Sequence, residues 1–101
     1  MAQLDLTQIL KLANSAPYKP IRSGCGRAYV VITDSKTTVN AVARACKTLG
    51  LMFLKKAYGT GNNAIYIGYD NADGRALGKA KAFAESLQSS GVSCYDDAVG
   101  D

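Results

Sequence analysis

Few side chains in this chain can do chemistry at neutral pH. The 101 residues include three cysteines and no histidine, and histidine is the side chain best suited to proton transfer near pH 7. Its absence excludes Ser-His-Asp and Cys-His catalysis and His-ligated metal sites. Cys25, Cys46 and Cys94 are far apart and form no C-x-x-C pair. Their spacing favours free thiols over a zinc site or a disulfide framework.

Two carboxylates and one thiol remain as candidates for catalysis. Asp34 and Asp70 end two strands that we expect to be antiparallel neighbours, so the two groups lie at opposite ends of the sheet and cannot share a proton. Cys25 is close in sequence to two arginines, which lower a thiol pKa, and the expected strand pairing also brings it near Cys94. We therefore expect no enzyme and no catalytic residue, cofactor or metal. A reactive Cys25 and a bridge between Cys25 and Cys94 stay open as alternatives.

One glycine-rich segment formally matches a nucleotide-binding fingerprint. Residues 59–64 read Gly-Thr-Gly-Asn-Asn-Ala, which is the G-x-G-x-x-A pattern. That fingerprint needs a helix directly after it, because the amides of the helix N-terminus hold the pyrophosphate. Here the following residues alternate as a strand does, so residues 59–63 predict a hairpin loop.

Charge is unevenly distributed along the chain. The net charge is +4, but residues 1–60 carry nine Lys and Arg against two Asp, whereas residues 61–101 carry three basic against six acidic residues. A basic first half of this kind attracts polyanions or acidic protein surfaces. The positive total argues against an acidic mimic of DNA.

Length and composition are those of one soluble domain. The chain is 48% hydrophobic and 20% charged, as is ordinary for globular proteins, and its length suffices for a single core. No apolar run reaches the ~18 residues of a membrane span, and the first residues lack the basic start of a secretory signal. We expect a single domain over residues 1–101, located in the cytoplasm and without membrane contact.

The apolar spacing over residues 27–96 predicts the order strand, helix, strand, strand, helix, strand. The expected strands cover residues 27–33, 51–58, 64–69 and 92–95, and the expected helices cover residues 35–49 and 73–89. Residues 1–26 precede this core as a helix over residues 6–14 and a long connection over residues 15–26. Residues 97–101 follow it as an acidic tail.

This order of elements predicts an α+β fold. Two β-α-β halves joined by a hairpin resemble the ferredoxin-like βαββαβ arrangement, a two-layer sandwich with an antiparallel sheet in the order 4-1-3-2 and both helices on one face. The extra N-terminal helix has an apolar stripe that must be buried. It either covers the opposite face of the sheet or leaves that face open.

Alternation along the strands places a group of tyrosines on the face away from the two helices. Tyr29, Tyr66 and Tyr95 come from three neighbouring strands, together with the small residues Ala64 and Gly68. On an uncovered sheet such rings stack the bases of single-stranded RNA or DNA. Beneath the N-terminal helix, or against a second copy of the chain, they are packing residues instead.

Basic residues gather around two segments of the first half of the chain. They are Lys19, Arg22 and Arg27, which accompany Tyr18 around the long connection, and Lys55 and Lys56, near the end of a strand. These side chains suit phosphates or an acidic protein surface. The plainer interpretation is a solvated face that keeps the protein soluble.

These observations favour a small non-enzymatic protein that binds a protein partner stoichiometrically, as an adaptor or inhibitor of the kind that mobile elements encode. The expected binding residues are the three tyrosines of the sheet and the residues of the two basic segments. The alternative is a module for single-stranded RNA or DNA that uses the tyrosine face and the basic half. A homodimer formed through the same face is a further alternative.

Overall fold

Side-chain caps begin the first two helices close to where the sequence predicts them. The computed structural model describes residues 5–22, 25–56, 62–71 and 73–100. Helix α1 (Leu6–Asn14) follows Asp5, whose carboxylate accepts a backbone N–H of the first turn at 2.9 Å. Helix α2 (Lys36–Leu49) follows Ser35, whose hydroxyl accepts the backbone N–H of Thr38 at 3.3 Å. It ends at Gly50, whose φ of 75° is the left-handed conformation that glycine favours.

Helix α3 (Arg75–Ser89) is capped from a neighbouring strand instead. It follows Gly74, which has no side chain to accept a hydrogen bond. The carboxylate of Asp70 accepts the backbone N–H groups of Ala76 at 2.7 Å and of Leu77 at 2.9 Å. Asp70 is only 5% exposed, so a buried charge in the preceding strand stabilises the first turn of α3.

Four strands form one antiparallel sheet, which confirms the predicted α+β class. They are β1 (Cys25–Ile32), β2 (Met52–Leu54), β3 (Ala64–Asn71) and β4 (Cys94–Gly100). Their order is β2-β3-β1-β4, which from the other edge reads β4-β1-β3-β2. β1 and β3 are central, and β2 and β4 are the edges.

The strand expected over residues 51–58 is much shorter in the structure. Among residues 51–56, the part of it that the structure describes, only Met52–Leu54 pair with β3, because Lys55 and Lys56 form a turn and Lys56 has a left-handed φ of 53°. The expectation that Lys56 extends this strand is therefore wrong. The hairpin predicted at residues 59–63 lies largely outside the described residues.

The last strand is longer than predicted and includes most of the expected acidic tail. The prediction ends it at Tyr95, whereas β4 runs to Gly100 and pairs with β1 along its length. The backbone hydrogen bonds of this pairing outweigh the poor strand propensity of Asp96 and Asp97. Residues 97–100 are thus part of the sheet, and the tail assignment is wrong.

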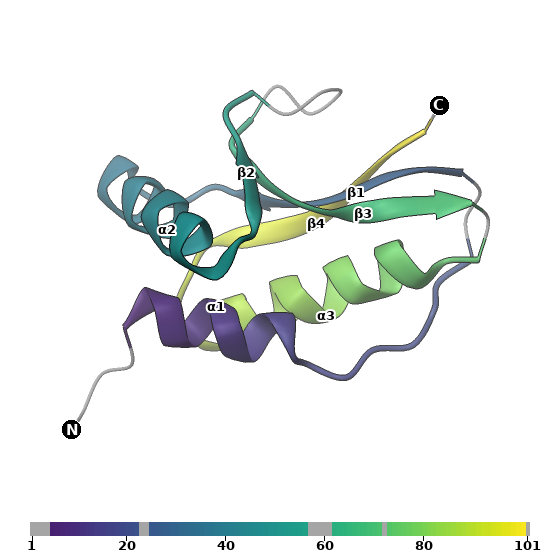
Figure 1. Cartoon of the computed structure of the whole chain (residues 1–101), viewed down its shortest axis with the longest axis horizontal. Helices are drawn as coiled ribbons and strands as arrows, with labels where there is room; N and C mark the ends of the chain where they lie inside the picture. Colours follow the sequence, from purple (N-terminus) through teal and green to yellow (C-terminus); the bar gives the residue numbers. More distant parts are fainter. Residues whose placement is uncertain (1–4, 23–24, 57–61, 72, 101) are drawn as a thin grey trace.

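All three helices contribute to one core on the same side of the sheet. Figure 1 shows α3 and α1 beneath the sheet and α2 beside β2, with no described helix above. The buried residues Leu10 and Ala13 of α1 belong to the main hydrophobic cluster, and α1 contacts both α2 and α3. Of the two alternatives for this helix, the one in which it covers the tyrosine face is therefore wrong, because its apolar stripe is buried against the other two helices.

A β-bulge divides β3 into two parts with opposite side-chain alternation. Tyr29 of β1 is opposite Tyr66, but the preceding residue Ala28 is opposite Gly68, so Ile67 is an extra residue in β3. Side chains beyond this point lie on the face opposite to the one that uninterrupted alternation predicts.

The bulge moves three residues of β3 to new faces. Gly68 and Asp70 lie on the helix side, where a Cβ on Gly68 would come within 3.2 Å of Ala76 in α3. Tyr69 is opposite Arg27 and lies on the other face. The expectation that Gly68 shares the tyrosine face is wrong, since it assumed an unbroken alternation.

Removal of the buried charge should destabilise the protein in a pH-dependent way. Burial raises the pKa of Asp70, but the amides of Leu77 and Ala76 lower it more, so its pKa falls below the ordinary 3.8. The stabilisation by ionised Asp70 is fully present above pH 3.8, the ordinary pKa. It is lost as the pH falls through the lower pKa that Asp70 has in the folded protein. We expect Asp70→Asn to lower the free energy of unfolding by about 1–3 kcal/mol at neutral pH.

Urea unfolding at neutral and at acidic pH measures this effect. The matched control is Glu85→Gln, because Glu85 is an exposed carboxylate further along α3, away from the first-turn amides that Asp70 accepts. The wild type and Asp70→Asn should converge in stability in acid. A difference that persists unchanged at low pH, or an equal loss in the control, would contradict this role of Asp70.

Candidate functional site

The sheet face away from the helices carries side chains from all four strands. The cross-strand register arranges them in three rows: Leu54, Ala64, Val31 and Tyr95; Met52, Tyr66, Tyr29 and Asp97; and Tyr69, Arg27 and Val99. We refer to this set as the open face, because no described helix packs on it (Figure 1). The register confirms that the three tyrosines of the sequence prediction share one face.

Three large side chains of the open face are exposed to solvent. Met52 is 56% exposed, Tyr69 47% and Tyr95 41%. Tyr66 and Val99 on the same face are half-buried. Methionine and tyrosine are enriched at the centres of protein interfaces, whereas they are uncommon as grouped solvent-exposed residues.

The ring of Tyr29 lies beneath this surface. Tyr29 is 1% exposed, and its ring meets that of Tyr66 edge to face, with centroids 5.7 Å apart and an interplanar angle of 65°. With Val31 and Ala64 it forms a second, small hydrophobic cluster. Tyr29 therefore supports the ring of Tyr66 and offers no surface of its own to a ligand.

Positive and negative charge are balanced on the open face. Arg27 is half-buried and is opposite Tyr69 on one side and Val99 on the other. Asp97 is opposite Tyr29, and its carboxylate accepts the N–H of Ala98 at 2.9 Å. Among the described residues, this face carries no excess of cations.

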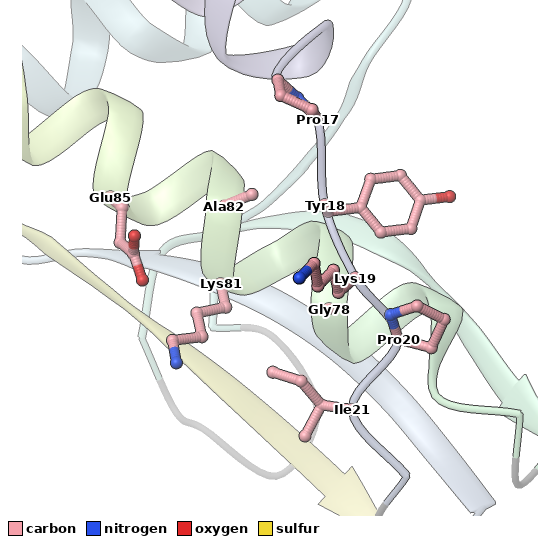
Figure 2. A pocket seen from close by; sticks show the side chains of 9 residues that line it. All are labelled: Pro17, Tyr18, Lys19, Pro20, Ile21, Gly78, Lys81, Ala82 and Glu85. Carbon is pink, nitrogen blue, oxygen red and sulfur yellow. The ribbon is translucent and has the colours of Figure 1, made fainter.

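The long connection lies on the helix side of the molecule. Residues 17–21 run along α3 past Gly78 (Figure 2), and the N–H of Ile21 donates to the carbonyl of Gly74 at 2.9 Å. A Cβ on either glycine would overlap the backbone of this segment. The two glycines, one helical turn apart, thus allow the extended chain to pack directly on the helix backbone.

Three predicted site residues belong to this connection and are separated from the open face. Tyr18, Lys19 and Arg22 are all exposed, and the ring of Tyr18 points away from α3 in Figure 2. A shallow cavity of about 250 Å³ lies between the connection and α3, next to Lys81 and Glu85. Lys55 and Lys56 lie elsewhere again, in the turn that follows β2. The predicted residues therefore form three groups in space.

The buried thiols of Cys46 and Cys94 are packing residues of the main hydrophobic cluster. Cys25 is opposite Asn71, and Cys94 is opposite Ile32 at the other end of β1, so the suggested bridge between the two cysteines is wrong. Burial raises the pKa of Cys94 and of Cys46 to about 11, which keeps both thiols protonated.

The two carboxylates are also structural. Asp70 caps α3 at one end of the sheet. Asp34 follows β1 at the other end, where it accepts the N–H groups of Ser93 at 2.9 Å and of Ser35 at 2.7 Å. The prediction that Asp34 and Asp70 lie at opposite ends is confirmed.

Sequence reasoning missed Tyr69 as a residue of this site. Simple alternation places it under the helices, and only the bulge turns it to the open face. The available signal is Gly68, because an isolated glycine within a strand often marks a bulge. The exposed Met52 and the half-buried Val99 also belong to this face, and Val99 was hidden in the expected tail.

Comparison with protein-family models, curated proteins and solved structures finds no match to this chain. What the open face does must therefore follow from its own chemistry. None of the helices in the described part of the chain has the length and apolar character of a membrane span.

Because the connection packs on α3 at Gly78, we expect Gly78→Ala to destabilise the protein. Alanine in place of a helical glycine normally stabilises by about 1 kcal/mol. At Gly78 we expect the opposite, a loss of about 1–3 kcal/mol, because the new methyl group meets the carbonyl of Lys19. Thermal and urea unfolding of Gly78→Ala measure the sign. A variant more stable than the wild type would show that the connection does not pack as described.

Proposed function

We propose that this protein acts without catalysis, by binding a protein partner in a fixed ratio through the open face. The observation that supports this most is that Met52, Tyr69 and Tyr95 are all exposed on one sheet face that no described helix covers. An adaptor or a small inhibitor, of the kind that mobile elements encode, acts in this way.

The energetics of burial favour a protein as the occupant of this face. Full burial of a methionine side chain contributes about 1.5–3 kcal/mol, and a tyrosine adds a hydroxyl that hydrogen-bonds at the edge of the contact. Such residues carry much of the binding energy where they are desolvated at the centre of an interface. Met52, Tyr69 and Tyr95 come from three different strands, so one partner surface can cover them together.

The face is also held rigid before binding. Tyr66 packs edge to face on the buried ring of Tyr29, and both residues belong to the central strands β1 and β3. A surface that is already ordered loses little conformational entropy when a partner binds.

Single-stranded RNA or DNA is the second candidate for the same face. A βαββαβ order of ferredoxin-like type, with an uncovered sheet, is the arrangement in which aromatic rings stack bases. Such binding also needs cations close to the rings. Here Arg27 is half-buried and Asp97 belongs to the neighbouring row of the same face, while Lys55 and Lys56 lie beyond the end of β2. The charge balance therefore favours a protein.

Truncation of the exposed tyrosines should remove binding of the protein partner. We expect the double variant Tyr69→Ala/Tyr95→Ala to lose the partner that the wild type captures from a lysate of its source cells. Each truncation should weaken binding to that purified partner about tenfold or more, as at the centre of an interface. Quantitative capture, followed by titration and measurement of the mass of the complex, gives the affinity and the ratio.

The matched control is Tyr18→Ala. Tyr18 is 44% exposed, close to the values for Tyr69 and Tyr95, but belongs to the connection on α3. Labelled oligonucleotides at low and at physiological salt test the second candidate. The proposal is contradicted if Tyr18→Ala loses the captured partner as fully as the double variant does. It is also contradicted if no protein partner is captured and the wild type binds oligonucleotides that the double variant does not bind.

A further inference from the structure

A cationic groove lies on the helix side of the molecule, between α2 and the end of β2. One cavity of about 440 Å³ is lined by residues that follow β1, by one side of α2 and by Phe53, Lys55 and Asn63. A second cavity of about 430 Å³ adjoins it and shares Asn40, Ala43 and Lys55 with the first. A volume of this size lies in the range of about 300–1,000 Å³ typical of small-molecule sites.

Three cations line this groove without an ion pair. Lys36 and Lys55 line the first cavity, and Arg44 and Lys55 line the second. None of them pairs with an acidic side chain among the residues that the structure describes. They come from two turns of α2 and from the turn after β2, so the fold brings together charges that are distant in sequence.

Among the described residues that line the groove, Asp34 is the one carboxylate, and both of its oxygens accept backbone N–H groups. Asp34 accepts the N–H of Ser93 with one oxygen and the N–H of Ser35 with the other, and these bonds lower its pKa. The three cations less this one carboxylate leave a net charge of +2. The groove as a whole therefore attracts anions.

The floor of the groove is apolar. Val39 and Ala43 from α2, Phe53 from β2 and Ile32 from β1 line the first cavity, and Ile32 is buried while the other three are half-buried. Asn40 and Asn63 stand at the same cavity with side-chain amides that can donate and accept hydrogen bonds. A flat ring can lie on such a floor while its polar edge meets the amides.

We propose that this groove binds a small phosphate-bearing molecule of nucleotide size. Its phosphates contact Lys55 and Arg44, which line the second cavity, and its ring lies on Phe53, Val39 and Ala43 in the first. Phosphate oxygens accept several charge-assisted hydrogen bonds at once, and a neutral ring gains from burial on the floor. None of these residues belongs to the open face, so the site is independent of the function proposed above.

Calorimetric titration of the full chain with adenosine diphosphate tests this site, with pyrophosphate as the second probe. We expect the diphosphate nucleotide to bind more tightly than pyrophosphate, because only the nucleotide uses the apolar floor. Lys55→Gln and Arg44→Gln should each weaken nucleotide binding about tenfold, the effect of one charge-assisted hydrogen bond.

The matched control is Lys47→Gln, which removes the same charge from α2 at an exposed position that lines neither cavity. Melting curves verify that each variant is folded. Nucleotide binding that is unchanged in Lys47→Gln and in the Tyr69→Ala/Tyr95→Ala variant supports the site. Absence of binding at low salt, an equal loss in Lys47→Gln, or pyrophosphate binding as tight as that of the nucleotide would overturn it.

Discussion

The buried carboxylate of Asp70 joins the sheet to the helical layer, and the placement of the open face depends on the same irregularity. One extra residue in β3 turns Asp70 toward α3, where it accepts two amides of the first helical turn. The same residue turns Tyr69 to the opposite side. With uninterrupted alternation Tyr69 would lie under α3 and the charge of Asp70 would face away from its amides. A single bulge therefore both caps a helix and forms part of a surface.

The three helices bury their apolar residues on one side of the sheet, and none of them packs on the open face. α1 fills the space between α2 and α3, and the connection that follows it packs on α3 through Gly74 and Gly78. The apolar stripe of α1 is thus buried against the other helices. This arrangement leaves the open face to the side chains of the strands, which provide a small cluster around Tyr29 and an exposed rim of tyrosine and methionine.

The open face and the cationic groove differ in chemistry as well as in place. The open face balances Arg27 against Asp97 around aromatic and apolar side chains, which suits a protein surface. The groove carries a net positive charge above an apolar floor, which suits a compact anion with a ring. Of the nine Lys and Arg in residues 1–60, the fold gathers three, Lys36, Arg44 and Lys55, at this groove.

Local sequence patterns determined the helices and strands, and long-range pairing decided which side chains those elements expose. Apolar periodicity predicted the helices and the α+β class, because this signal acts within a few residues. The observed caps at Asp5 and Ser35 are equally local. The tyrosine face followed from alternation, which holds wherever a strand is regular. The bulge at Ile67, the extension of β4 and the packing of α1 depend on partners far away in sequence. No local pattern encodes those partners, so the exposure of Tyr69, the burial of Tyr29 and the gathering of Lys36, Arg44 and Lys55 were decided only by the tertiary structure.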